Sequence, residues 1–262
     1  MSGTATYGGN TLLNGGTLAL RAPAGTGSPI PNSPVLCISP GACLDLSGVV
    51  SGFSLGDGQT LEGAGAVKGN CNLDNGSSLI PGNSIGTLTF SDSLTLLAGS
   101  QTVMKLSTTP KTNDLLLVSG TLAFGGTLVV TNSGPLALSE GDSFQLFSAG
   151  TFSGQFSSLQ LVSPGRGLAW DTSLLASRGI LKVISIKPRF GSCRLSGTNF
   201  VALGFDGPPN GAYVALCSTN LNLPASQWIP WATNYFDANG DFGFTNSFNA
   251  SPGGRFFRLQ LQ

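Results

Sequence analysis

The sequence predicts an all-β protein in which a parallel β-helix is followed by a small β-sandwich. Three observations support this prediction. A short phrase of glycine, a hydroxyl residue and an alternating apolar strand recurs through the first two-thirds of the chain. No stretch longer than about ten residues has the 3.6-residue apolar period of a helix. The phrase is lost after residue 186, so we expect repeats over residues 1–186 and a separate module over residues 187–262.

Each copy of the phrase predicts one short strand that begins after a turn glycine, where a positive φ costs little. Such a strand cannot bury its apolar face alone, so copies must stack, which favours a solenoid. An antiparallel sandwich or barrel is the alternative architecture. The copies are Gly15–Leu20, Gly41–Leu46, Gly58–Gly63, Gly76–Gly82, Gly86–Phe90, Gly99–Leu106, Gly120–Phe124 and Gly126–Val130.

The spacing of the phrase predicts the size of one coil. Leu18, Leu44, Leu61 and Leu79 mark successive copies and are separated by 26, 17 and 18 residues. Coils of this length predict a rod of about eight or nine coils, roughly 40 Å long at about 4.8 Å per coil.

The repeated phrase no longer occurs after the apolar run Ile180–Ile186. Lys187–Arg189 reads as a linker, and the remainder contains four short strand patterns, the last at Arg255–Leu261. Asn239–Gly240 is a signal for a type I′ hairpin. This part predicts a small β-sandwich.

The composition disfavours several classes of function. Histidine is absent and there are only two glutamates, Glu62 and Glu140, whereas catalysis at neutral pH usually recruits histidine or tuned carboxylates. We therefore expect no enzymatic activity and no cofactor. The 12 basic residues balance the 12 acidic ones without clustering, which disfavours nucleic acid as a partner. No apolar run has the length of a membrane-spanning helix, and Met1–Tyr7 lacks the features of a secretory leader.

Carboxylates form two candidate sites. A polysaccharide-degrading β-helix would gather acids on one outward face, but Asp45, Asp57, Glu62 and Asp74 are spaced by 12, 5 and 12 residues, which does not match a coil. Solvated turn residues are the favoured interpretation. Asp237–Asp241 resembles the opening of a calcium loop but lacks the later glutamate, so a hairpin turn is favoured and no metal is predicted.

A glycine-rich run and a group of aromatic residues give two further candidates. Gly63–Gly69 lacks the ending of a phosphate-binding loop and reads as a glycine-rich corner. Trp228, Trp231 and Tyr235, with Phe236, could form a platform for a sugar ring, although a core role is commoner.

The five cysteines allow two pairings. Cys37 could bridge to Cys43 across a turn, and Cys193 to Cys217 across neighbouring strands. The alternative is that they are small buried apolar residues.

The longest phrase carries a family resemblance. Pro81–Phe90, with the letters PGNSIGTLTF, resembles the autotransporter-associated β-strand repeat proteins, which are bacterial passenger domains in which such a phrase recurs. Tyr7–Leu18 is similar to their repeat unit, and the resemblance covers about residues 1–185. The tail from Ser218 to Arg258 is similar to immunoglobulin-like or fibronectin-like modules that follow these repeats in some large bacterial surface proteins. Further stretches that resemble the last coils are Asp114–Gly120, Gly141–Phe147 and Gly167–Thr172.

The resemblance implies a right-handed parallel β-helix that is exported and serves as a stalk or adhesive surface. The residues after 186 are too few for the membrane barrel of a true autotransporter, so export by another route, or with the barrel on another chain, is expected. We therefore expect a non-enzymatic structural or adhesive protein, extracellular or on the outer cell surface, with glycans or like chains as partners. The alternatives are a carbohydrate-binding module on a β-helix scaffold and a polysaccharide-degrading β-helix.

Overall fold

The computed structural model describes residues 3–25, 28–134, 137–165, 167–208, 210–247 and 254–262. Its ordered elements are almost all strands, which confirms the predicted fold class. Contacts divide the chain into two units. The β-helix unit comprises Met1–Ser163 and Trp170–Lys182, and the sandwich unit comprises Pro164–Ala169 and Val183–Gln262.

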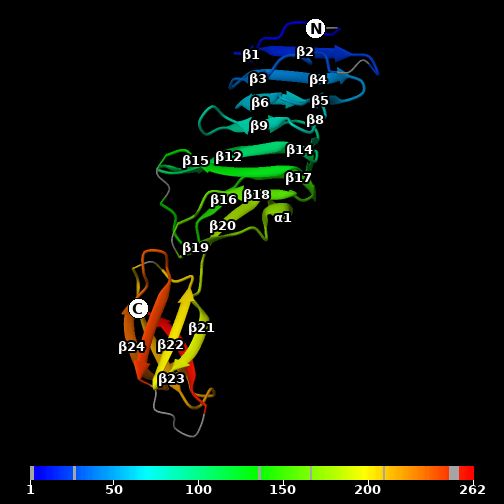
Figure 1. The fold of residues 1–262 in the computed structure, drawn as a ribbon. Coiled ribbons are helices and arrows are strands. Elements are labelled where there is room, and N and C mark those ends of the chain that lie inside the picture. The colour runs from blue at the N-terminus through cyan, green and yellow to red at the C-terminus, as the bar shows by residue number, and fades with distance from the viewer. Residues whose placement is uncertain (1–2, 26–27, 135–136, 166, 209, 248–253) are drawn as a thin grey trace. The chain divides into compact units, whose positions relative to one another are not determined.

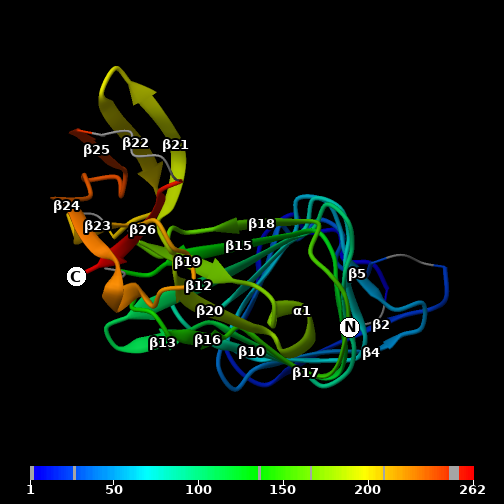
Figure 2. The same cartoon turned by 90° about the horizontal axis from the view of Figure 1, so that it is seen from below.

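The β-helix unit is built from three faces of parallel strands, stacked along the chain as Figures 1 and 2 show. Face 1 contains β1 (Thr11–Leu13), β3 (Val35–Ile38), β6 (Thr60–Gly63), β9 (Ser78–Pro81), β12 (Gln101–Thr108), β15 (Thr127–Asn132) and β18 (Ser158–Leu161). Face 2 contains β2 (Thr17–Ala22), β4 (Cys43–Val49), β7 (Ala66–Lys68) and β10 (Thr87–Phe90). Face 3 contains β5 (Phe53–Leu55), β8 (Cys71–Leu73) and β11 (Leu94–Leu96). The long strands β14 (Leu115–Phe124) and β17 (Phe147–Gly154) continue faces 2 and 3 together.

The solenoid has about five coils, so the expected eight or nine coils are too many. One reason is that coils are unequal. Leu36 pairs with Leu61, which makes that coil 25 residues long, whereas Leu61 pairs with Leu79, which makes the next one 18. A second reason is that residues after β18 build other structure.

Apolar side chains stack in columns inside the coils. In face 1, Leu36, Leu61, Leu79 and Leu128 point inward, and their exposed fraction is 0%. Complete burial of one leucine contributes about 1.5–3 kcal/mol. Because each leucine is covered by the neighbouring coils, its burial depends on stacking, as expected for a solenoid protein.

The four leucines that marked the repeat do not form one column. Leu18 pairs with Leu44 on face 2, whereas Leu61 pairs with Leu79 on face 1. The partner of Leu44 in the next coil is Val67. The prediction of one series was wrong because each coil crosses three faces and the same phrase begins a strand on more than one of them.

Glycine corners explain why the phrase begins as it does. Gly58, Gly76 and Gly99 have φ values of 71°, 78° and 81°. The amide of Gly58 donates to the carbonyl of Gly76 at 3.1 Å, and the amide of Gly76 donates to that of Gly99 at 3.0 Å. A Cβ atom at Gly76 would lie 1.8 Å from Oδ1 of Asp57. The positive φ favours glycine at all three corners, and at Gly76 a Cβ atom would also displace the side chain of Asp57.

Smaller elements follow the last full coil. The pair β16–β20 is antiparallel, β19 joins β20, and the short helix α1 packs on β17. Phe124, Phe147 and Phe156 cluster at this end, with ring centroids 4.8–5.7 Å apart. These elements are β16 (Ser143–Gln145), β19 (Leu168–Asp171), α1 (Leu175–Arg178) and β20 (Ile180–Ser185), whereas β13 (Lys111–Asn113) is a hairpin strand beside β12.

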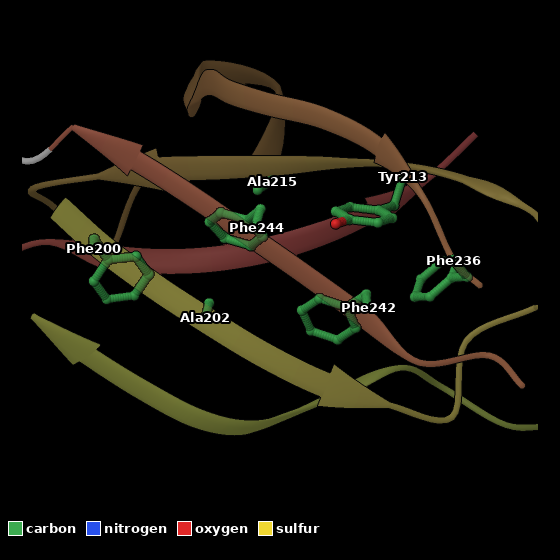
Figure 3. Close-up of a cluster of buried hydrophobic side chains, with 7 residues drawn as sticks. All are labelled: Phe200, Ala202, Tyr213, Ala215, Phe236, Phe242 and Phe244. Carbon is green, nitrogen blue, oxygen red and sulfur yellow. The ribbon is translucent and has the colours of Figure 1, made fainter. Parts of the chain in front are cut away.

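The sandwich unit consists of two antiparallel three-stranded sheets, six strands where four patterns were predicted. The first sheet contains β21 (Arg189–Ser196), β22 (Asn199–Phe205) and β25 (Phe242–Ser247). The second contains β24 (Ile229–Tyr235), β23 (Ala212–Ser218) and β26 (Phe256–Leu261), and a 3₁₀ turn covers Ala225–Gln227. Figure 3 shows the buried cluster between the sheets, which is Phe200, Ala202, Tyr213, Ala215, Phe236, Phe242 and Phe244.

Asn239–Gly240 does not form the predicted hairpin. β24 pairs with β23 and β25 pairs with β22, so this turn carries the chain from one sheet to the other. Gly240 has a φ of 81°, but Asn239 does not have the positive φ that a type I′ turn requires. The carboxylate of Asp237 instead accepts the amides of Asn239 at 2.7 Å and Asp241 at 2.9 Å, which favours a crossing turn.

Candidate functional site

The most regular surface feature is a row of uncharged polar side chains on the outside of face 1. Thr60 pairs with Ser78, Ser78 with Gln101, Gln101 with Thr127, and Thr127 with Ser158. We call these five residues the polar row. Neighbouring members stand about 4.8 Å apart, because that is the spacing of paired strands.

A second row lies beside the polar row on the same face. Glu62 pairs with Cys37 and Ile80, and Val103 pairs with Val129. These side chains are half-buried. Burial, reinforced by the neighbouring carboxylate of Glu62, raises the pKa of the Cys37 thiol, which disfavours a nucleophilic thiolate there.

Face 3 carries a comparable outward row, with which the polar row of face 1 can be compared. Ser54 pairs with Asn72, Asn72 with Thr95, Thr95 with Ala123, and Ala123 with Ser153. We call this set the face-3 row. Like the polar row, it has no charged member, and four of its five side chains can form hydrogen bonds.

Face 2 carries a small charged cluster. Asp45 lies 3.4 Å from Arg21 and 3.8 Å from Lys68. Its carboxylate also accepts the hydroxyl of Ser47 at 2.5 Å and the amide of Ser47 at 2.9 Å. The hydrogen bonds from Ser47, followed by the attraction of Lys68, lower the pKa of Asp45 to about 2. This carboxylate is therefore a stable anion and a poor general acid.

The phrase that carries the family resemblance has a structural role. Lys105 lies 3.1 Å from the fully buried Asp114 and donates to the carbonyls of Pro81 at 2.9 Å and Gly82 at 3.2 Å. Asp114 accepts the amides of Gly86 at 2.9 Å and Lys105 at 2.8 Å. Burial raises the pKa of Asp114 although these donors oppose it. The pair holds both ends of the corner between β9 and β10, and sequence reasoning did not single it out.

The four candidate acids do not form one group. Asp45 lies on β4 of face 2 and Glu62 on β6 of face 1. Asp57 and Asp74 lie in successive coils of the corner that follows face 3, because Leu55 pairs with Leu73. Within the described residues, no group of three or more histidine, cysteine, aspartate or glutamate side chains could hold a metal.

The glycine-rich run Gly63–Gly69 contains a strand as well as corners. Gly63 ends β6, residues 64–65 turn the chain, and β7 occupies residues 66–68. A Cβ atom at Gly63 would lie 2.1 Å from the carbonyl oxygen of Ile38 in the preceding coil. The glycine is therefore set by close stacking of coils.

The three candidate aromatic residues lie in different environments. Trp228 is buried against Val214 and Leu216 on the outer side of the second sheet, and its indole N–H donates to the carbonyl of Leu223 at 2.9 Å. Trp231 faces the core between the sheets, with its ring 4.9 Å from that of Phe257. The structure thus places Trp228 and Trp231 on opposite sides of one sheet.

Tyr235 is separate from both tryptophans, since it is 67% exposed at the end of β24. A cavity of about 380 Å³ adjoins Trp231. Its lining is Cys217, Ser218, Thr219, Leu223, Gln227, Ile229, Trp231 and Arg255. Of the three candidate aromatic residues, Trp231 alone is among these.

All five cysteines are unpaired, so neither predicted bridge forms. Cys37 and Cys43 lie on faces 1 and 2, and Cys193 and Cys217 lie on different sheets of the sandwich. The alternative interpretation fits Cys71 and Cys217, which are buried, and burial raises the pKa of Cys71 to about 12. Cys193 is exposed and does not follow it.

Comparisons with known proteins give no identification: no family model, curated protein or solved structure matches the chain. In the part of the chain that the structure describes, no helix is long and apolar enough to cross a membrane.

Proposed function

We propose that this chain is a non-enzymatic structural protein of the cell exterior, in which the β-helix unit is a stiff scaffold whose polar row on face 1 contacts glycans or like chains. The observation that carries the proposal is the polar row, which repeats in register over five strands of face 1. Beneath it, Leu61, Leu79 and Leu128 are fully buried, with Thr102 between the last two. A surface of this kind is ordered before any partner arrives, so little conformational entropy is lost on binding.

Stiffness follows from the bonding pattern. Strands within each face are hydrogen-bonded to the coils before and after them, and the corners are bonded to each other. Bending the rod would break several of these bonds at once. The likeness of Pro81–Phe90 to bacterial passenger repeats supports the placement outside the cell.

A binding experiment on the full chain tests the contact surface. We expect the chain to co-sediment with an insoluble polysaccharide such as cellulose or chitin, or to self-associate in analytical ultracentrifugation. The double variant Ser78→Lys and Thr127→Lys, which places charges in the polar row, should abolish that interaction. The matched control is Ser54→Lys with Thr95→Lys in the face-3 row, and it should retain it.

Two results would overturn the proposed contact surface: no association of the unmodified chain with any of these partners, or equal binding by the two double variants. Release of soluble sugar from the polysaccharide would show catalysis and remove the non-enzymatic part of the proposal.

The cellular location needs its own measurement. An epitope-tagged full-length protein should be digested when protease is added to intact cells. Full protection of the tagged protein until the cells are lysed would contradict an exterior location.

A second candidate function is carbohydrate binding by the sandwich unit, and the cavity beside Trp231 favours it. The cavity is lined by Trp231 together with the polar residues Gln227 and Thr219, a combination common in ligand pockets. Calorimetric titration of the full chain with soluble oligosaccharides tests it. The variant Gln227→Ala should weaken binding, and Thr233→Ala, on the exposed part of β24, should not. Absence of binding to every oligosaccharide would remove this candidate.

A further inference from the structure

The sequence contains four asparagine–glycine pairs, and in the structure their glycine amides differ in hydrogen bonding. They are Asn14–Gly15, Asn75–Gly76, Asn210–Gly211 and Asn239–Gly240. An asparagine followed by glycine is prone to cyclise, because the unsubstituted glycine lets its backbone nitrogen approach the side-chain amide carbon. That approach requires a glycine N–H that is not already held by an acceptor.

Three of the four glycine amides are held in turns. The amide of Gly76 donates to the carbonyl of Gly99 at 3.0 Å, that of Gly211 to Pro208 at 2.8 Å, and that of Gly240 to Asp237 at 3.2 Å. Each bond must open before the nitrogen can attack, so these sites react only through local opening.

Gly15 differs from the other three glycines. Within the described residues its amide has no hydrogen-bond acceptor, and both Asn14 and Gly15 are exposed at the corner between β1 and β2. The hydroxyl of Ser39 in the next coil donates to Oδ1 of Asn14 at 3.4 Å. A donor at this oxygen stabilises the negative charge that develops there during attack.

We propose that Asn14 is a site of spontaneous deamidation in the folded protein. The backbone nitrogen of Gly15 forms a bond to Cγ of Asn14 and loses its proton to water. The bond from Cγ to Nδ2 breaks as Nδ2 takes up a proton from water and leaves as ammonia, which gives a five-membered succinimide. Water then opens either carbonyl of the ring and leaves an aspartyl or an isoaspartyl residue at position 14.

The product changes a corner that is bonded to the next coil. The carbonyl of Leu13 accepts the amide of Ser39 at 2.9 Å, and the carbonyl of Gly16 accepts that of Cys43 at 2.8 Å. The isoaspartyl form adds one carbon to the main chain between these two carbonyls, so both bonds cannot keep their geometry. Formation of the isoaspartyl residue at position 14 therefore loosens the first coil.

Peptide mapping by mass spectrometry after incubation of the full chain at mildly alkaline pH tests the proposal. In the folded protein, we expect position 14 to deamidate at least about tenfold faster than the other three pairs, since a protecting hydrogen bond must break at each of those. In urea, the four pairs should react at similar rates. Equal or faster reaction at position 75, 210 or 239 in the folded protein would overturn the proposal.

Gly15→Ala is the matched variant. Gly15 has no positive φ, and a Cβ atom there meets no heavy atom within 4 Å, so the fold should be unchanged. Deamidation at position 14 should fall about tenfold or more while the other three sites keep their rates, because the added methyl group hinders the approach of the nitrogen. An unchanged rate at position 14 would contradict the succinimide route and overturn the proposal.

Discussion

The two units bury their apolar side chains in different ways. The β-helix unit repeats medium-sized side chains, and Leu36, Leu61 and Leu79 are each covered by the same kind of residue from neighbouring coils. The sandwich unit relies on a few large rings, such as Tyr213 and Phe242, whose centroids lie 5.4 Å apart. Repetition distributes burial along the chain, whereas the aromatic core concentrates it. Single substitutions should therefore act on separate parts of the molecule.

The largest expected effect comes from removing one ring of the concentrated core. Phe242→Ala deletes contacts with Phe190, Tyr213 and Phe236 and should lower stability by about 3–5 kcal/mol. Leu61→Ala in the β-helix unit should cost about 2–5 kcal/mol. Calorimetry of the full chain should show two transitions, each shifted by one variant. A single transition shifted by both would contradict separate cores.

Glycine corners should be essential only where coils stack closely. Gly126 has a φ of 60°, and a Cβ atom there would lie 2.2 Å from the carbonyl oxygen of Ser100. Gly16 has a similar φ of 69° but no neighbour within 4 Å. By denaturant unfolding, Gly126→Ala should cost about 2–5 kcal/mol and Gly16→Ala about 1–2 kcal/mol. Equal losses would show that backbone conformation, and not stacking, sets the requirement.

A buried hydroxyl distinguishes the two cores further. Thr102 occupies the leucine column of face 1, and its Oγ1 has no hydrogen-bond partner among the described residues, whereas the hydroxyl of Tyr213 reaches the carbonyl of Gly243 at 3.4 Å. Thr102→Val removes the unpaired polar atom at constant shape and should stabilise the β-helix unit by about 1 kcal/mol. Thr102→Ser, which keeps the hydroxyl, should not stabilise it. A loss of stability in the valine variant would indicate an unseen partner for the hydroxyl.

The smallest expected effect is electrostatic. The pKa of Asp45 is lowered from 3.8 to about 2 in the folded chain, so its contribution is complete above pH 4 and is lost as the pH falls through 2. Asp45→Asn should lower stability by about 1 kcal/mol or less at neutral pH, because its charged partners are partly exposed. The variant should also lose less stability than the parent between pH 4 and pH 2. Burial raises the pKa of Asp114, so the contribution of that carboxylate to stability changes with pH in the direction opposite to that of Asp45.

The sequence predicted the stacking but not the assignment of strands to faces. Alternating apolar residues and turn glycines determine that a segment is a strand with one buried side, and this is local information. The pairing of Leu44 with Val67, in place of Leu61, depends on how many residues each corner takes. The sequence pattern is the same on different faces, so the pattern alone could not assign them.

The candidate aromatic residues show both what the sequence offered and where it stopped. Trp228 and Trp231 are three positions apart, and an odd spacing places two side chains of an extended segment on opposite faces, which argues against a shared platform. The register shift between Ala215 and Leu216 on the neighbouring strand is not visible in the residues 228–231. By contrast, the alternation of Thr60 with Leu61 and of Ser78 with Leu79 was visible and would have indicated the polar row had the coil lengths been known.

The unequal coils have a practical consequence. The coil from Leu61 to Leu79 takes 18 residues, whereas the coil from Thr102 to Leu128 takes 26, and part of the surplus is a hairpin in which Ser107 pairs with Thr112. The parallel ladder resumes in register beyond it. A guest peptide inserted at the tip of this hairpin should accordingly be displayed at a fixed position along the axis of the β-helix unit. The unit could therefore hold inserted epitopes at a defined spacing.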